Sequence, residues 1–462
     1  MNQKLEQWFH LKENNTDVKT EVLAGVTTFM AMAYILAVNP SILADAGMDK
    51  GAVFTATALA ATFATVLMAL FANYPFVLAP GMGLNAYFAY TVVLGMGYTW
   101  QMALTAVFIE GLVFILLSVT NVRQAIFNAI PISLKQAVSA GIGLYIAFIG
   151  LQNAQVIVDG SKLVTLYSFK AAIADGTIRS VGVGVILALV GILITGILLA
   201  KNVKGNILWG ILITWGLGIV CELTGIYQPN FELGMYSTLP DFSNGISIPS
   251  LSPILGQCFK INPSELLTLD FAVVMFAFLF VDLFDTLGTL IGVSAKAKML
   301  DENGSLPKLS GALMSDALGT TVGAVLGTST TTTFVESAAG VAEGGRTGLT
   351  AMVSAALFFV SLLLSPIFLA IPSFATTPAL VVVGFLMVGS VLDIDFNDVT
   401  EALPAFICLL VMPLSYSISE GIGFGFISYA VINLVSGKAK DKKISPILYG
   451  LSILFVLKYI LI

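Results

Sequence analysis

Apolar runs long enough to cross a membrane alternate with short polar segments along almost the whole chain of 462 residues. A helix that crosses a hydrocarbon core of about 30 Å needs about 20 mostly apolar residues, so the chain has room for about fourteen spans. The pattern predicts an all-α polytopic membrane protein. Two of the expected spans are interrupted, one by YPFVLAPGMGLNAYFAYTVV at 74–93 and one by LGTSTTTTFVESAAG at 326–340.

The composition agrees with a protein that lies in a membrane. Hydrophobic residues make up 57% of the chain, charged residues make up 10%, and the mean hydropathy is +0.95. Soluble domains have about 25% charged residues. When fourteen spans are counted from an inside start, most of the 21 Lys and Arg residues fall on one side, so we expect the N-terminus to be cytoplasmic. Residues 1–20 lack the features of a secretory signal and are predicted to be a cytoplasmic leader.

The two halves of the chain resemble each other. Sliding the second half over the first by 251 residues places Glu336 opposite Asn85. Seven spans per half is an odd number, so the halves would have opposite orientations, as in many secondary transporters. The expected division is a leader at 1–20, a first repeat at 21–221, an extracytoplasmic loop at 222–265, a second repeat at 266–436, and a basic loop with an extra apolar segment at 437–462.

The two interrupted segments occupy corresponding places in the repeats. Pro80, Gly81 and Gly83 break the first, and the threonines at 330–333 disfavour helix in the second. We predict a short extended piece in each, followed by a half-helix that begins near Leu84 or Phe334. Free N–H groups and the positive dipole ends of two half-helices attract an electronegative ligand atom. The pattern therefore predicts a binding site in which Asn85 and Glu336 occupy the first turns.

A second concentration of polar side chains lies in FLFVDLFDTLGTLIG at 278–292. Asp282, Asp285, Thr286 and Thr289 are spaced to share one stripe of a helix. A carboxylate near the centre of a membrane helix costs about 2.5–3.5 kcal/mol, so such residues usually line a cavity or pathway. The alternative is that the acids only bond to neighbouring helices. Other acids of the membrane region are weaker candidates, with structural or gating roles: Glu110, Asp316 and Glu420.

Several classes of function find no support in the sequence. The three cysteines have no CxxC spacing and the single histidine, His10, precedes the first span, so no metal site and no cofactor is expected. No nucleophile–base pair or nucleotide loop indicates an enzyme. Basic residues form no stripe for nucleic acid. A channel is less well supported than a transporter, because paired broken helices fit alternating access.

Four segments carry a resemblance to a known family. GVTTFMAMAYILAVNPSIL, APGMGLNAYFAY, VDLFDTLGTL and TSTTTTFVESAAGVAEGGRTGL resemble the signature segments of AzgA-like purine permeases, the guanine/hypoxanthine/adenine branch of the nucleobase–cation symporter-2 family. The resemblance implies two inverted repeats of seven helices, divided into a core and a gate domain. It implies that the third and tenth segments hold the substrate and the eighth contacts it. It also implies proton symport, and often a homodimer contacting through the gate domain.

The resemblance assigns roles to individual residues. Asp282 and Glu336 would bind the edge of the purine ring, and Asn85 would shape the site. Gly83, Thr333 and Phe334 complete the expected substrate site, with Phe29 and Tyr87 as alternative stacking partners for the base. We expect the proton to be carried by an acid among Asp282, Asp285 and Glu336. Burial and a neighbouring acid both disfavour the charged form of a carboxyl group, so one of these acids binds a proton more readily. Thr286, Thr289 and Thr332 are expected to form a supporting polar face.

The predicted function is proton-coupled import of a purine nucleobase, with guanine or hypoxanthine ahead of adenine, by a multi-pass protein of the cell membrane. The expected partners are the base, the proton, the lipid bilayer and a second copy of the chain. One alternative is a transporter of the same fold for xanthine or uracil. The other is a transporter of an inorganic anion, which the carboxylates disfavour because anion sites prefer cationic or neutral surroundings.

Overall fold

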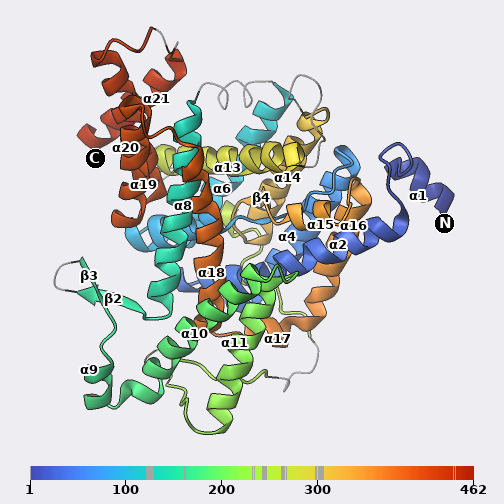
Figure 1. Ribbon diagram of the computed structural model, residues 1–462, viewed down its shortest axis with the longest axis vertical. Helices are drawn as coiled ribbons and strands as arrows, with labels where there is room; N and C mark the ends of the chain where they lie inside the picture. The colour runs from blue at the N-terminus through green and yellow to red at the C-terminus, as the bar shows by residue number, and fades with distance from the viewer. Residues whose placement is uncertain are drawn as a thin grey trace.

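The computed structural model describes residues 2–120, 130–160, 163–230, 233, 235–241, 247–261, 266, 268–296, 299, 306–440, 442 and 444–461. Helices dominate these residues and form two bundles that lie against each other (Figure 1). The predicted helical membrane fold with a core and a gate part is confirmed. Parts of the predicted loop 222–265, namely 231, 232, 234, 242–246 and 262–265, lie outside the described residues.

The core bundle lies on the right in Figure 1 and takes helices from both predicted repeats. Helix α4 packs on α3, α14 and α16, while α6 packs on α13 and α14 and α2 packs on α16. Its long helices are α2 (Val18–Met32), α3 (Ile35–Asp45), α4 (Lys50–Phe71), α6 (Trp100–Val119), α13 (Leu269–Lys296), α14 (Leu309–Leu326) and α16 (Gly348–Val360).

The gate bundle lies on the left and below in Figure 1. Helix α18 packs on α8, α10 and α11, and α19 packs on α8 and α20. The close approach of α8 and α18 needs a glycine, because a Cβ atom at Gly143 would lie 2.6 Å from the carbonyl oxygen of Gly384. Its helices are α8 (Ile132–Asn153), α10 (Val181–Ala200), α11 (Asn206–Leu223), α18 (Ser373–Val388), α19 (Val399–Leu414) and α20 (Ile418–Val435).

The two interrupted segments meet inside the core bundle, as predicted. Strand β1 (Leu78–Pro80) pairs antiparallel with β4 (Thr331–Thr333), with Leu78 opposite Thr333. Beyond β1 the chain forms α5 (Met82–Ala86) and the π-helix η1 (Tyr87–Gly95), and beyond β4 it forms α15 (Ser337–Ala342). The half-helices thus begin within three residues of the expected positions. Because the strands bond to each other, irregular backbone is tolerated deep inside the bundle.

Small elements connect the long helices. The hairpin of β2 (Ile157–Gly160) and β3 (Leu163–Leu166), α9 (Phe169–Ala174) and η2 (Thr177–Arg179) lead from α8 to α10. The other short elements are α1 (Asn2–Phe9), η4 (Gln257–Phe259), η5 (Ser361–Leu364), α17 (Ser365–Leu369) and η6 (Gly389–Asp393). Helix α21 (Pro446–Leu461) runs back along α20, because Ser452 donates to the carbonyl of Phe426 and Tyr459 donates to Glu420.

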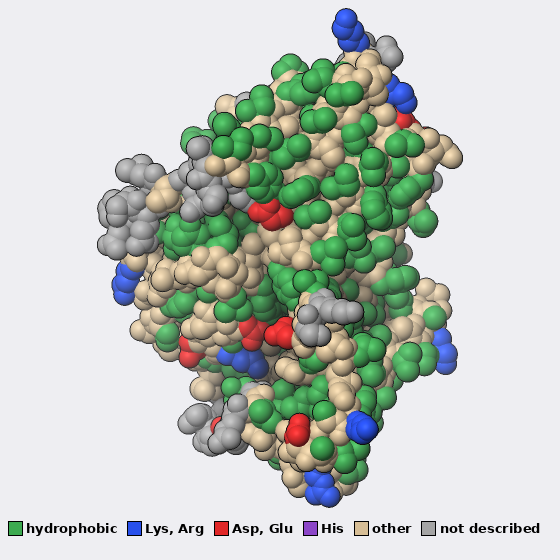
Figure 2. Space-filling view, turned by 90° about the vertical axis from the view of Figure 1, so that its left-hand side faces the viewer, with side chains coloured by type: hydrophobic (Ala, Val, Ile, Leu, Met, Phe, Trp, Pro, Cys, Tyr) green, Lys and Arg blue, Asp and Glu red, His purple; other side chains and the backbone are tan. Residues whose placement is uncertain are grey.

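The surface suits a lipid environment. In the described part of the chain, ten helices are long and apolar enough to cross a membrane, and two shorter apolar helices lie at Val399–Ser415 and Pro446–Leu457. Figure 2 shows the side of the gate bundle, where hydrophobic side chains are spread over much of the surface and Lys and Arg lie mainly at its margins. Leu193 and Leu434, for example, are 67% and 62% exposed. The count of fourteen spans stays a prediction.

Candidate binding cavity between the two bundles

A cavity of about 550 Å³ lies where the two bundles meet. Small-molecule sites usually measure about 300–1,000 Å³. The core bundle contributes the broken segments and a face of α13, with Tyr34, Gly83, Asp285, Thr289, Thr333, Phe334 and Glu336 among the lining residues. The gate bundle contributes the beginning of α8 and the end of α18, with Lys135, Gln136, Ser139, Ile142, Met387 and Ser390. The acids thus lie on the core side, and the gate side carries a lysine, an amide and two hydroxyl groups.

Glu336 lies at the beginning of the half-helix α15, where the threonine strand ends. It occupies the N-cap position of α15, and the strand is held by a hydrogen bond from the Phe334 N–H to the carbonyl of Val77 at 3.0 Å. The hydroxyl of Tyr34 donates to the Oε1 atom of Glu336 at 2.6 Å, and both residues line the cavity. Sequence reasoning missed Tyr34, which lies in the break between α2 and α3.

The polar stripe of α13 faces two different surroundings, the cavity and helix α14. Asp285 and Thr289 line the cavity. Asp282 and Thr286 are fully buried outside it, where the Thr286 hydroxyl lies 3.0 Å from Oδ1 of Asp282 and 2.8 Å from Oδ1 of Asp316. Asp316 belongs to α14, so this pair of acids joins two core helices. The structure therefore brings Asp285, and not Asp282, together with Glu336.

Buried polar side chains hold the broken segments from behind. Asn85 does not line the cavity; it accepts a hydrogen bond from Ser329, and its amide nitrogen lies 3.4 Å from the carbonyl oxygen of Pro80. Thr330 donates to the Oε2 atom of Glu110 at 2.7 Å. Thr332 is fully buried and also lies outside the lining. These contacts fix the backbone of both broken segments, which positions Gly83, Thr333 and Glu336 at the cavity.

The three aromatic candidates for stacking lie in different places. Phe334 lines the cavity. Phe29 instead packs on Phe358, with ring centroids 5.1 Å apart, and Tyr87 packs on Phe278 at 4.8 Å. Gly83 allows the core to touch the gate, because a Cβ atom there would lie 2.7 Å from Cγ2 of Ile142 in α8.

The donor set of the cavity suits a neutral organic ligand with several hydrogen-bonding groups. Two carboxylates accept, and the amide of Gln136 both donates and accepts. The Ser390 hydroxyl donates to the carbonyl of Gln136 at 2.9 Å, which ties the gate helices together at this point. Among the described residues, no group of three or more His, Cys, Asp or Glu side chains is arranged to hold a metal ion.

Comparisons with known proteins point to transport. A family model described as a permease family, of the xanthine/uracil type, matches residues 19–456. The guanine/hypoxanthine permease PbuO of Bacillus subtilis is 45% identical over 455 residues, which cover 97% of this chain and 99% of that protein. The adenine permease AdeP of Escherichia coli is 41% identical over 462 residues, covering 99% and 96%. The transmembrane domain of the cyanobacterial bicarbonate transporter BicA has a similar fold, with a TM-score of 0.64 at 15% identity, covering 88% of this chain and 96% of that one.

Proposed function

The chain belongs to the nucleobase–cation symporter-2 family of permeases, and we propose that it carries purine nucleobases across a cell membrane together with protons. It is a multi-pass membrane transporter and not an enzyme. Relatives named as guanine/hypoxanthine and adenine permeases support a purine as the substrate.

The observation that carries this proposal is that Asp285 and Glu336 both line the core side of one cavity. A purine presents ring N–H groups, which carboxylates accept in strong hydrogen bonds. Phe334 supplies an aromatic face for the ring, and the backbone N–H groups near Thr333 and Gly83 meet its acceptor atoms. In this assignment Asp285 takes the substrate role that the sequence prediction gave to Asp282.

Movement of the core bundle against the gate bundle would expose the cavity to each side in turn. A proton taken up by a core acid would neutralise part of the negative charge that moves with the base. The distribution of basic residues supports a cytoplasmic N-terminus as part of the proposal, and two copies would pair through the apolar outer surface of the gate bundle. These features extend the proposal of purine transport.

Because the fold is similar to that of the bicarbonate transporter BicA, transport of an inorganic anion is the second candidate function. At 15% identity that likeness concerns the fold alone. The cavity holds two carboxylates against one lysine, Lys135, and this excess of acids favours a ligand with N–H donors over an anion, because like charges repel at close range in a low-dielectric site.

Uptake by proteoliposomes tests the proposal. Labelled hypoxanthine, guanine, adenine and uracil are offered with and without an inward proton gradient, and empty liposomes are the control. Accumulation of a purine that depends on the gradient is expected. Uptake of bicarbonate or sulfate without uptake of any base would replace the purine proposal by the anion transporter.

A further inference from the structure

The Tyr34 hydroxyl and the Glu336 carboxylate form a contact within the cavity that the predicted site did not contain. The phenol oxygen lies 2.6 Å from Oε1, a distance typical of a strong bond between a hydroxyl and an ionised acid. The ring of Tyr34 is fully buried, so its hydroxyl has little freedom to turn away. Glu336 therefore meets a ligand with one oxygen already engaged.

We propose that Tyr34 is a positioning and specificity residue that holds Oε1 of Glu336 away from the base and leaves Oε2 as the oxygen that accepts a ring N–H. This inference rests on the proposed purine site. An acid accepts two neighbouring N–H donors only when both of its oxygens face them. The bond to Tyr34 occupies one lone pair of Oε1 and fixes the direction in which this oxygen faces, so Oε2 is the oxygen left to accept from the base. The second acid of the site, Asp285, reads a separate part of the base.

This arrangement determines how two closely related bases compare. Hypoxanthine has one donor, N1–H, on its pyrimidine edge, whereas guanine has N1–H and an adjacent 2-amino group. A Glu336 with one free oxygen gains little from the extra donor of guanine. Removing the Tyr34 hydroxyl frees Oε1, so the carboxylate then accepts both donors of guanine and still only one from hypoxanthine.

The test compares Tyr34→Phe with a matched control, Tyr90→Phe. Tyr90 also donates to a carboxylate, Oδ2 of Asp45 at 2.7 Å, but it does not line the cavity. Apparent dissociation constants for guanine and hypoxanthine are measured on purified protein by their effect on the melting temperature. In Tyr34→Phe the ratio of the two constants is expected to shift towards guanine by about 10- to 100-fold, as expected for one hydrogen bond to a charged group. In Tyr90→Phe it is expected to stay within about twofold of the wild type.

The ratio separates a specificity role from a structural one, because both bases are measured on the same folded protein. An unchanged ratio in Tyr34→Phe, or equal weakening of both bases, would overturn the inference. If little protein folds, competition of the two bases for uptake on the same membranes gives the same ratio. Failure of the proposed function itself is distinct, since the wild type would then bind neither base.

Discussion

The ammonium group of Lys204 lies 2.5 Å from the Oε1 atom of Glu343, in an ion pair between the gate bundle and the core bundle. Lys204 lies in the turn between α10 and α11, and Glu343 is the C-cap residue of α15. Among the ion pairs of the described residues, this one alone joins the two bundles. The short helix α15 thus has a cavity acid, Glu336, at its beginning and a contact between the bundles at its end.

Reversing either charge of this pair should slow purine uptake, because the ion pair stabilises one arrangement of the two bundles. Lys204 is 59% exposed, so we expect the effect of Lys204→Glu or Glu343→Lys to be modest, about 2- to 5-fold in the initial rate, and weaker at high salt. The double exchange should restore most of the rate. Lys201→Glu is the control, since Lys201 forms no ion pair in the described chain. If the double exchange did not restore uptake, the ion pair would have no role in the transport cycle.

Neutralising the cavity acids should weaken purine binding much more than it lowers the amount of folded protein. For Glu336→Gln and Asp285→Asn we expect the dissociation constant to rise by about 10- to 100-fold, the value of one or two charge-assisted hydrogen bonds. Binding to purified protein and its melting temperature measure the two effects. Glu110→Gln is the control, because Glu110 is buried but bonds to Thr330 behind the cavity. Normal binding by Glu336→Gln would return Glu336 to a structural role.

Substitutions of Asp282 and Asp285 should have different effects when proton coupling and purine binding are measured separately. Asp282 lies outside the cavity and shares the Thr286 hydroxyl with Asp316, an arrangement in which one hydroxyl hydrogen serves two acids. We therefore expect Asp282→Asn to keep purine binding within about threefold of the wild type but to lose gradient-driven accumulation. Asp285→Asn should lose both. Gradient-driven accumulation that survives in Asp282→Asn would exclude Asp282 as the proton carrier.

The sequence predicted most of the architecture, because membrane helices and their interruptions leave strong local signals. The proline and glycines at 80–83 and the threonines at 330–333 predicted the extended pieces, and the antiparallel strands β1 and β4 confirm them. The break between α2 and α3 was not predicted. Its sequence, MAMAYIL, contains neither glycine nor proline, yet the helix ends at Met32 and the next begins at Ile35.

The cavity was harder to predict than the helices that surround it. Helical spacing places Asp282, Asp285, Thr286 and Thr289 on one stripe, yet the stripe is wide enough to face two neighbours. Which part faces the cavity depends on how α13 is turned relative to α14 and the gate, and no local pattern records that angle. Tyr34 was missed for the same reason, since its partner Glu336 lies 302 residues away in the sequence.

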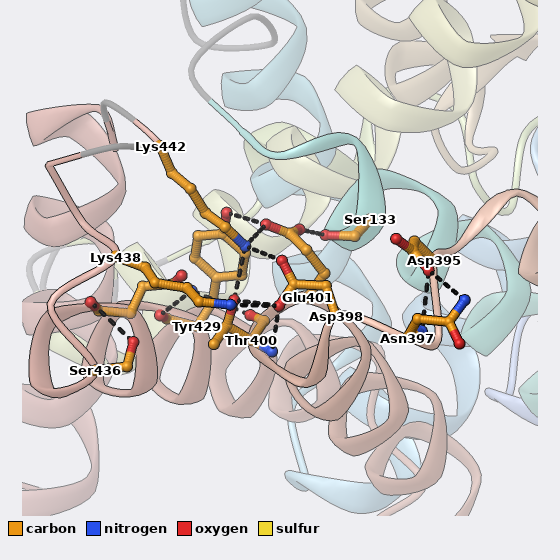
Figure 3. Close-up of polar contacts among 11 residues, drawn as sticks. Ser133, Asp395, Asn397, Asp398, Thr400, Glu401, Tyr429, Ser436, Lys438 and Lys442 are labelled. Carbon is orange, nitrogen blue, oxygen red and sulfur yellow. Dashed lines mark hydrogen bonds and ion pairs between the residues drawn. The ribbon is translucent and has the colours of Figure 1, made fainter.

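A cluster of polar and charged side chains lies at the end of the gate bundle where α8 and α19 begin. Figure 3 shows the ammonium group of Lys442 directed towards two acids, with Nζ at 2.8 Å from Oδ2 of Asp398 and 2.5 Å from Oε1 of Glu401. Glu401 also accepts hydrogen bonds from Ser133 and Tyr429. Lys442 lies in the segment that leads to α21, so the cluster ties this segment to α8, α19 and α20.

This cluster should stabilise the protein by an amount that is constant around neutral pH. Hydrogen bonds from Lys442 and Thr400 hold the pKa of Asp398 well below its usual range. Partial burial opposes the charge of Lys442, but the bonds to Asp398 and Glu401 outweigh it and raise its pKa. The Asp398 contribution is present above the ordinary carboxyl value of about 3.9 and is lost as the pH falls through the lowered pKa. The Lys442 contribution is present below about 10.4 and is lost as the pH rises through the raised pKa.

Lys442→Gln should therefore lower the melting temperature by about 1–3 °C, and this difference should be the same between about pH 5 and pH 9. It should shrink in stronger acid, where Asp398 takes up a proton in both proteins, and in stronger base, where Lys442 loses its charge. Melting curves of the two proteins across this range measure it. Lys440→Gln is the control, because Lys440 is exposed and forms no ion pair among the described residues. A difference that disappeared between pH 6 and pH 8 would contradict the assignment, since neither group titrates there.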